Sequence, residues 1–349
     1  MIHTQAITIR LLTSPADLAR YDAWVRSHPQ GSVWQSLQWK VFQEARGRDV
    51  KIYGALEEAK IVSSALVVRD TTVGGLSTWE IPRGPLGDGS VMPHVLEEAR
   101  RARCVTLYYS PVTPLTNDAL RGAEKSGRYV QAQATLLVDL TPDEQTILAQ
   151  MHQKGRYNIR VAERHGVTVE PSGDVEAFVR LLDTTTARDA FRGHSRAHYA
   201  AFLHSLPGSF MLMALSAAKE PIAALMGVMW PPLEGCGLGL SNSPDPNPNP
   251  NPHPRTGIYY YGASSHSHRA LMAPYLLQWQ AMRMCKEQGC FTYDLLGITP
   301  DGAQDHPWEG ISAFKEKFGG SVVTYPPEQM IVLRPWAWRG LKMKRRILG

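Results

Sequence analysis

The residues best suited to chemistry gather in the segment 258–325. Three consecutive tyrosines open it, and the small residues 262–265 follow directly. In a strand, alternation places Tyr259 and Tyr261 on one face and Tyr260 on the other. Small residues after a strand allow a ligand to approach the backbone closely. Tyr259 and Tyr261 are therefore candidates for substrate binding, with core packing as the alternative.

A lysine between two phenylalanines follows in the motif FKEKFGG. Phe314 and Phe318 are four residues apart, which puts both rings on one face of a short helix predicted over 311–318. Gly319 can end this helix as its C-cap. Taken alone, the motif is best explained by core packing beside a solvated Lys315.

Cations recur on a basic helix predicted over 155–164. Arg156, Arg160 and Arg164 are four residues apart, so they project from one helix face. Together with Lys154, this face can bind phosphate groups through charge-assisted hydrogen bonds. The alternative is a basic face that is only solvated by water.

Metal-ligating residues do not form a recognisable set. His194 and His198 are four residues apart, but no glutamate follows His194 in the HExxH pattern, and Arg196 lies between them. The four cysteines match no zinc spacing and are too few for a disulfide framework. We therefore expect no metal, no cofactor and reduced cysteines.

Composition bounds the class of protein. The chain has 349 residues, of which 43% are hydrophobic and 20% charged, so it is globular, with about two domains. Its longest apolar stretch, Pro221–Trp230, is about half as long as a membrane-spanning helix. The N-terminus lacks the pattern of a signal peptide. We expect a soluble, cytoplasmic protein.

The net charge of +5 is unevenly placed. Between Arg334 and Gly349 lie six lysines and arginines and no carboxylate, together with Trp336 and Trp338. Such a tail can contact an anionic membrane surface or the phosphates of another partner. A solvated terminal helix is the alternative.

Helices and strands alternate in an order that occurs twice. In the first half, helices are predicted at 14–25, 35–45, 92–103, 118–126 and from a Thr141 cap, and strands at 51–56, 61–69, 76–82, 105–110 and 132–139. In the second half, helices are predicted at 155–164, 174–188, 195–206 and 274–288, and strands at 210–217, 221–230, 236–241, 258–262 and 291–295. This repeated order predicts two similar α+β domains.

One segment interrupts the second half. Residues 244–255 read PDPNPNPNPHPR, and alternating prolines block both helix and sheet pairing. We expect an enlarged surface loop between two strands, and its role stays open.

Several motifs together point to one family. YYGAS, PYLLQWQAM, GCFTYDLLGI and HPWEGISAFKEKFGG follow one another in this order. Upstream lie VWQSLQW at 33–39, IPRGPLGD at 81–88 and QKGRYNIRVAERHGV at 153–167. The set resembles the FemABX family of non-ribosomal peptidyl transferases, which are aminoacyl-tRNA-dependent enzymes that build the peptide branch of bacterial peptidoglycan.

The resemblance implies a fold of two acetyltransferase-like (GNAT-type) domains that face each other across a cleft. We expect the first domain over residues 1–145, completed by 325–349, and the second over 146–324. No heptad run is visible, so the resemblance implies a member without a coiled-coil arm.

The resemblance also implies the reaction. An amino acid passes from aminoacyl-tRNA to an amine of the stem peptide of a UDP-linked or lipid-linked muramyl-pentapeptide precursor, which forms the interpeptide bridge. The tRNA ester is already activated, so the enzyme must hold both substrates in line and stabilise the oxyanion. A lipid-linked acceptor would place the protein at the inner membrane face, which the basic tail can contact. The amino acid, the branch position, the acceptor carrier and the oligomeric state stay open.

Site residues follow from the matching motifs. Phe314 and Lys315 match the family's Phe-Lys pair near the tRNA acceptor end, and Lys315 would support the transition state. Arg83 and Asp88 are candidates to hold the peptide or its amine. The full set of expected substrate-binding residues is Lys40, Arg83, Asp88, Lys154, Arg156, Arg160, Tyr199, Tyr259 and Tyr261.

Two other classes of protein stay open. An acyl-CoA-dependent N-acyltransferase of the same fold binds CoA with backbone amides before a helix. The segment RGPLGDG is one residue too long for that loop, and Pro85 removes an amide donor. The basic tail by itself fits a non-catalytic RNA-binding or membrane-binding protein.

Overall fold

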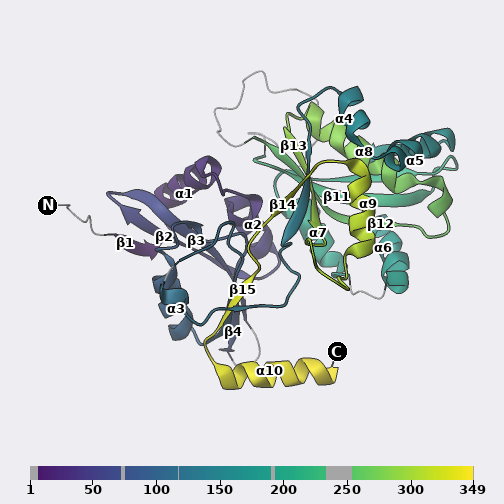
Figure 1. Cartoon of the computed structure of the whole chain (residues 1–349). Helices are drawn as coiled ribbons and strands as arrows, with labels where there is room; N and C mark the ends of the chain where they lie inside the picture. The colour runs from purple at the N-terminus through teal and green to yellow at the C-terminus, as the bar shows by residue number, and fades with distance from the viewer. Residues whose placement is uncertain (1–6, 72–74, 117, 190–192, 233–253, 349) are drawn as a thin grey trace. The chain divides into compact units, whose positions relative to one another are not determined.

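The computed structural model describes residues 7–71, 75–116, 118–189, 193–232 and 254–348. The chain forms two compact units, each built on one β-sheet (Figure 1). The first unit holds the described residues up to Gln133 and from Tyr325 onward, and the second holds those from Ala134 to Thr324. The α+β class that the sequence predicts is confirmed.

The first unit contains an eight-stranded sheet. Its elements are β1 (Thr8–Leu11), α1 (Pro15–Ser27), η1 (Val33–Gln35), α2 (Leu37–Ala45), β2 (Asp49–Glu57), β3 (Lys60–Thr71), β4 (Ser77–Ile81), β5 (Leu86–Gly87), α3 (Met92–Arg101), β6 (Cys104–Tyr109), η3 (Asp118–Leu120), β7 (Glu124–Lys125), β15 (Gln329–Val332) and α10 (Pro335–Leu348). The strand order is β1–β2–β3–β4–β6–β15–β7, and β5 pairs with β3. Of these pairings, only that of β4 with β6 is parallel.

The second unit contains a seven-stranded sheet. Its elements are β8 (Ala134–Asp139), α4 (Glu144–Gln150), α5 (Gln153–Arg164), β9 (Thr168–Pro171), α6 (Val175–Asp189), α7 (Arg196–Ser205), β10 (Ser209–Leu215), β11 (Pro221–Trp230), β12 (Thr256–Ser264), η4 (Arg269–Leu271), α8 (Ala273–Glu287), β13 (Thr292–Ile298), α9 (Glu309–Lys315), η5 (Glu316–Phe318) and β14 (Ser321–Thr324). Read from β9, the strand order is β9–β10–β11–β12–β13–β8–β14, and β12 and β13 form the parallel pair.

The two sheets share one design. In both, the fourth and fifth strands of the order are the parallel pair, and the sixth strand lies antiparallel between the fifth and the seventh. In both sheets the sixth strand is distant in sequence from its two neighbours in the sheet. It is β15 in the first sheet and β8 in the second. The prediction of two similar domains is therefore confirmed.

This pairing also corrects the predicted boundary after residue 145. Strand β8 pairs with β13 and β14, which both belong to the second sheet. The chain therefore enters the second unit at Ala134, about a dozen residues before the predicted position, and it returns to the first unit at Tyr325.

Most predicted elements form close to their predicted bounds, and two differences have local causes. The hydroxyl of Thr141 donates to Asp139, so Asp143 caps α4 instead. The helix predicted over 118–126 is wrong, since η3 and β7 replace it and Gly122 has a left-handed φ of 85° between them. The strand predicted at 236–241 and most of the proline-rich segment, 244–253, lie outside the described residues.

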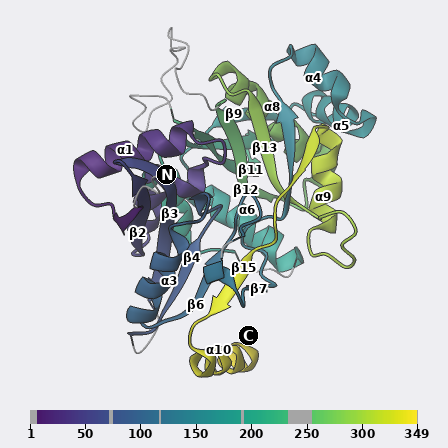
Figure 2. The same cartoon turned by 60° about the vertical axis from the view of Figure 1, so that its left-hand side comes forward.

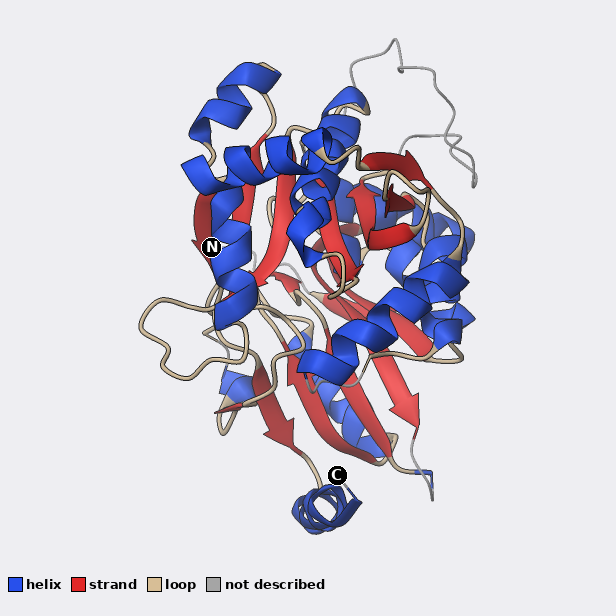
Figure 3. Ribbon diagram, turned by 90° about the vertical axis from the view of Figure 1, so that its right-hand side faces the viewer, coloured by secondary structure: helices blue, strands red, loops and turns tan. Residues whose placement is uncertain are grey.

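Helices pack against the strands of both sheets, as Figure 3 shows in blue and red. In the second unit, α8 contacts β10 to β13, whereas α6 contacts β11 and β12. In the part of the chain that the structure describes, no helix is both long and apolar enough to cross a bilayer.

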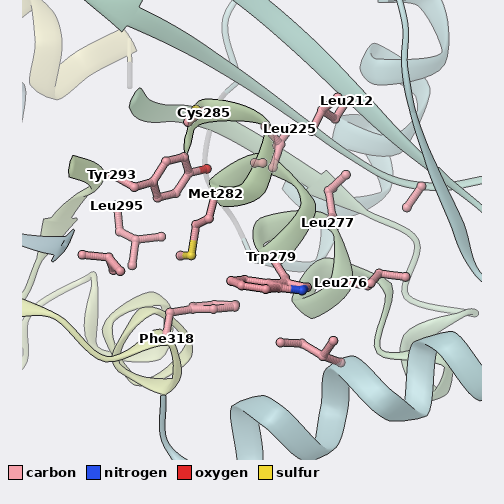
Figure 4. Packing of buried hydrophobic residues seen from close by; sticks show 14 of the residues in the cluster. Leu212, Leu225, Leu276, Leu277, Trp279, Met282, Cys285, Tyr293, Leu295 and Phe318 are labelled. Atoms are coloured by element: carbon pink, nitrogen blue, oxygen red, sulfur yellow. The ribbon is translucent and has the colours of Figure 1, made fainter. Parts of the chain in front are cut away.

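The core of the second unit surrounds α8. Trp279 and Met282 of α8 pack in one cluster with Leu295 and Phe318 (Figure 4). Phe318 is fully buried, and deleting a ring of this kind usually destabilises a protein by about 3–5 kcal/mol. Gly319 follows as the predicted C-cap with a φ of 73°. In the FGG sequence, the Phe318 ring is thus buried in the core, and the glycines that follow it turn the chain into β14.

Candidate active site

The parallel pair of the second sheet opens part-way along its length. Strands β12 and β13 pair at three positions, the last of which joins Ile258 to Asp294. The hydroxyls of Thr256 and Thr292, 2.7 Å apart, join the closed end. From the next residues onward, the two described strands share no ladder pair. In the first sheet, by contrast, pairing of β4 with β6 continues to the last residue of both strands.

A bulge in β13 shapes this opening. Its register against β8 shifts between Asp294 and Gly297, and Leu296 has a φ of 55°, which is unusual for a branched residue. One carboxylate oxygen of Asp294 accepts a hydrogen bond from the Leu296 amide at 2.7 Å and another from the Thr135 hydroxyl. A Cβ at Gly297 would lie 2.5 Å from the Trp308 ring. The buried Asp294 thus holds the bulge in a defined conformation.

Lys315 reaches into the opening from α9. Its side chain is buried, with 6% exposure, so the alternative of a solvated lysine is wrong. The ammonium donates to the Gly297 carbonyl oxygen at 2.6 Å and lies 5.7 Å from the centroid of the Tyr259 ring. Burial lowers the pKa of Lys315 to about 8, and the negative charge of Asp294 opposes this shift.

The ammonium retains capacity for another ligand. A protonated lysine has three N–H donors. Gly297 supplies the one hydrogen-bond acceptor that the described residues offer to Lys315. The remaining donors and the positive charge can therefore meet an anionic oxygen, provided that a substrate reaches the split between β12 and β13.

Aromatic rings pack around the helix that carries Lys315. Phe314 lies 5.1 Å from Tyr275 and 5.2 Å from Phe318, both in edge-to-face contact. Tyr259 packs against the same core, and its burial raises the pKa of its phenol to about 12. Tyr259 is therefore neutral at physiological pH, and Asp294 is the charged neighbour of Lys315.

The two predicted tyrosines do not share a face. Tyr261 is paired with Met226 and Tyr259 with Gly227, so Tyr260 is the extra residue of a β-bulge. A bulge breaks strict alternation. Tyr259 consequently lies beside Lys315, whereas the Tyr261 hydroxyl lies 2.6 Å from Nε2 of His198 on α7. The structure thus separates Tyr261 from Lys315.

Tyr199 packs beside Tyr261 rather than beside Lys315. It is 2% exposed, and its hydroxyl accepts a hydrogen bond from the His194 amide at 3.0 Å. Its ring contacts Phe178 and Tyr261 with centroids 5.0 and 5.1 Å apart. The contacts of Tyr199 are therefore those of a packed core residue.

The basic helix α5 meets the FKEKFGG turn. The His152 amide donates to the Lys317 carbonyl at 3.1 Å, and a Cβ at Gly155 would overlap the same carbonyl oxygen. Arg156 donates to the carbonyls of Ala149, at 3.0 Å, and Met151, at the end of α4. Two motifs that are about 160 residues apart in the sequence are thus in direct contact.

Only part of the predicted phosphate-binding face points to solvent. Lys154 and Arg160 are exposed, and Arg164 lies 5.8 Å from the Tyr157 ring. Arg156 is half-buried at the end of α4. Lys154, Arg160 and Arg164 therefore have side chains that can reach a phosphate, whereas Arg156 is held by backbone carbonyls.

Replacing Gly155 with alanine should destabilise the protein by about 1–3 kcal/mol, because the new methyl group meets a backbone oxygen that cannot move independently. Chemical denaturation followed by circular dichroism measures this change. Gly310→Ala is the matched control, since Gly310 lies in α9 with open space around it. Equal stability of Gly155→Ala and wild type would contradict the close packing.

In the first unit, one glutamine joins two of the predicted motifs. The side-chain amide of Gln35 donates to the Pro82 carbonyl at 2.7 Å and accepts from the Leu66 amide at 2.9 Å. A Cβ at Gly84 would lie 2.7 Å from the same side chain. The VWQSLQW and IPRGPLGD motifs therefore depend on each other for their conformation.

The turn residues differ in accessibility. Arg83 is buried, donates to the Ala132 carbonyl at 2.7 Å and stacks 3.8 Å above the Tyr325 ring. Asp88 is exposed and accepts from the Ser90 amide at 2.8 Å. Lys40 forms an ion pair with Glu44 on α2. Arg83 therefore stabilises the turn, whereas the side chain of Asp88 is accessible to solvent.

Comparison with known proteins identifies the family. The sequence profile of the FemAB family matches residues 17–109, 120–219 and 252–342. The chain belongs to the FemAB family. The lipid II:glycine glycyltransferases of Staphylococcus haemolyticus (strain JCSC1435) and Staphylococcus aureus are each 21% identical to it, over 86% of this chain and 87% of theirs.

Solved structures agree with this FemAB assignment at the level of the fold. The crystal structure of FemX matches with a TM-score of 0.72 and 16% identity, over 95% of this chain and 99% of FemX. A tandem GNAT protein from the clavulanic acid pathway matches with a TM-score of 0.54 and 12% identity, over 94% and 99%. The predicted acetyltransferase-like architecture is confirmed.

Sequence reasoning missed a charged cluster in the first unit of this FemAB protein. Arg128 donates to Glu80 at 2.6 Å and to both carboxylate oxygens of Glu328 at 2.8 and 2.9 Å. Its guanidinium also lies 3.5 Å from the centroid of the Tyr108 ring. Since Arg128 and Glu328 are 200 residues apart, no local spacing signals this pair.

Proposed function

We propose that this protein transfers an amino acid from aminoacyl-tRNA to an amine of a lipid-linked peptidoglycan precursor, and so forms the interpeptide bridge. Family membership and the names of the glycyltransferase relatives support the reaction class and the lipid-linked acceptor. The observation that carries the proposal is the buried ammonium of Lys315 at the split between β12 and β13.

The reaction needs positioning and charge stabilisation. The acceptor amine attacks the ester carbonyl carbon of aminoacyl-tRNA, which forms a C–N bond and a tetrahedral oxyanion. The C–O bond to the tRNA ribose then breaks, and the ribose hydroxyl leaves with the proton that the amine gives up. A preorganised cation beside the oxyanion lowers this barrier, and the effect is larger in a site that excludes water.

Lys315 would supply that cation. Its N–H donors beyond the one used by Gly297 would be available to the substrate. The bulge that Asp294 holds fixes the position of the Gly297 oxygen. Phe314 would hold the helix that carries this cation, since its ring packs against Tyr275 and Phe318.

The other residues divide by accessibility. We assign substrate contact to the exposed side chains of Asp88, Lys154 and Arg160, which can approach the amine or phosphates of the acceptor. Lys40 is half-buried beside Glu44, and reaches a substrate only after leaving that ion pair.

For four further residues that were predicted to bind substrate, we propose a positioning role instead. Arg83, Arg156 and Tyr199 each bind a backbone group of their own unit. Tyr261 contacts His198 on α7. These residues would hold the elements that carry the site rather than contact the substrate.

Activity should decrease as the pH rises through about 8. Stabilisation of the oxyanion requires protonated Lys315, whose pKa is lowered to about 8 by burial. A lysine with an ordinary pKa would retain its charge until about pH 10. A pH profile of the transfer rate under saturating substrates measures the descending limb.

The matched variant for this profile is Asp294→Asn. The carboxylate raises the pKa of Lys315, so its removal should move the descending limb to lower pH. A limb that stays in place in Asp294→Asn, or wild-type activity that is constant to pH 10, would exclude Lys315 as the titrating group.

The function itself is tested with a pool of charged tRNAs that carries labelled amino acids. We expect label in a lipid-linked precursor in vesicles, less label in the soluble UDP-linked precursor, and none without tRNA. The Lys315→Met variant is the negative control. Transfer from acetyl-CoA, with tight stoichiometric binding of that donor, would instead assign the protein to the acyl-CoA-dependent transferases.

A further inference from the structure

The C-terminal helix α10 is joined to the first sheet at one end. The amides of Leu333 and Arg334 both donate to the Val105 carbonyl, at 2.9 and 3.2 Å. The helix follows at once, and the Trp338 amide donates to the Arg334 carbonyl at 3.0 Å. Figures 1 and 2 show α10 directly after β15, beyond the end of that strand. This anchoring holds the helix against β6 of its own unit.

The helix displays large apolar side chains to solvent. Trp336 is 81% exposed and Met343 is 64% exposed, the two highest values among the exposed large hydrophobic residues that the structure describes. They are seven residues apart, which is two helical turns, so they lie on one face. This helix face therefore presents two large apolar side chains to which an apolar surface could bind.

Cations flank this apolar face. The guanidinium of Arg339 lies 5.1 Å from the Trp336 ring, and the Lys342 ammonium lies 5.3 Å from the Trp338 ring. The sequence from Arg334 to the C-terminus has six lysines and arginines and no carboxylate. The surface is therefore complementary to an anionic partner that also accepts apolar side chains.

We propose that α10 docks the first unit onto an anionic phospholipid surface, with Trp336 and Met343 at the boundary between headgroups and acyl chains. Tryptophan favours that level of a bilayer, and lysines and arginines beside it bind anionic headgroups. A nucleic acid would use the same cations but gives no reason for the exposed Met343. The inference deepens the proposed function and rests on it for its meaning, since a lipid-linked acceptor lies in a membrane.

Sedimentation with vesicles tests the apolar contribution. The full chain should associate with vesicles of phosphatidylglycerol and phosphatidylcholine, and much less with phosphatidylcholine alone. The double variant Trp336→Ala, Met343→Ala should associate about tenfold less. The control variant Phe291→Ala, Val322→Ala removes two exposed apolar side chains of the second unit and should behave as wild type.

The ionic contribution has its own matched pair. The double variant Arg339→Glu, Lys342→Glu should reduce association by at least about tenfold, and added salt should weaken wild-type binding. The variant Lys60→Glu, Arg121→Glu changes the net charge equally at two exposed positions of the first unit and should have little effect.

Two outcomes would overturn the proposal. One is wild-type protein that does not prefer anionic vesicles. The other is full vesicle association of the Trp336→Ala, Met343→Ala variant. In that case, a loss of tRNA binding in the Arg339→Glu, Lys342→Glu variant would assign α10 to tRNA. The vesicle assay contains neither substrate. Failure of docking and failure of aminoacyl transfer are therefore observed separately.

Discussion

Replacing Lys315 with methionine should reduce aminoacyl transfer by on the order of a hundredfold. Methionine keeps much of the length and packing of the lysine but removes the cation that would face the developing oxyanion, and loss of one such group typically has this effect. The loss should be in kcat, with KM for the acceptor nearly unchanged, because the charge acts mainly in the transition state. Steady-state kinetics with a purified charged tRNA measures both constants.

Stability measurements separate this effect from misfolding. In the folded protein the pKa of Lys315 is lowered to about 8 by burial, so its charge opposes folding at pH 7, and this opposition is relieved as the pH rises from about 8 to 10.5. Lys315→Met should therefore be at least as stable as wild type at pH 7. Lys317→Met, two residues away and less buried, is the matched control and should retain activity. Wild-type turnover in Lys315→Met would remove this residue from the mechanism.

Replacing Arg128 with methionine should destabilise the first unit by about 3 kcal/mol. The guanidinium neutralises Glu328, whose side chain is 4% exposed, and also contacts Glu80. Removing one partner of a buried ion pair leaves an uncompensated charge, which usually destabilises by about 3–5 kcal/mol. We expect the lower end of that range because the Arg128 side chain is 23% exposed. Urea denaturation at constant m-value measures the change.

Two further variants define the cause. Arg121→Met removes an arginine that is 81% exposed and paired with Asp118, and should change stability by less than about 0.5 kcal/mol. The double variant Arg128→Met, Glu328→Gln should recover part of the lost stability, because no buried charge is left at position 328. Additive losses in the double variant would show that the ion pair is not the source of the effect.

Local sequence patterns predicted most helices and strands because their determinants lie within a few residues. The helix α1 begins where Ser14 accepts a hydrogen bond from the Asp17 amide, with Pro15 in the first turn. Gly319 ends the FKEKFGG helix with a left-handed φ, as predicted from its position. Where a local competitor was overlooked, as with Asp143 at the start of α4, the predicted boundary shifted by only a few residues.

Motif order was informative about the family for a different reason. The VWQSLQW and IPRGPLGD motifs stabilise each other, because the Gln35 side chain of the first donates a hydrogen bond to the Pro82 carbonyl of the second. The same side chain accepts a hydrogen bond from the Leu66 amide. Gly155 likewise allows the FKEKFGG turn to pack closely against its helix, because it has no Cβ to overlap the turn's backbone. Motifs that stabilise one another across the fold occur together, so their joint presence was more specific than any single one.

The sequence by itself determined the α+β class, the duplicated order of elements, the FemAB resemblance and Lys315 as the residue to examine. The tertiary structure alone decided which side chains meet. Long-range pairing places β8 in the second sheet. A one-residue bulge at Tyr260 separates Tyr259 from Tyr261. Tertiary packing buries Lys315, which the motif taken alone would leave solvated. Helical and strand periodicities depend on neighbouring residues, whereas register, burial and ion pairs depend on residues that are distant in the chain, so no local pattern contains them.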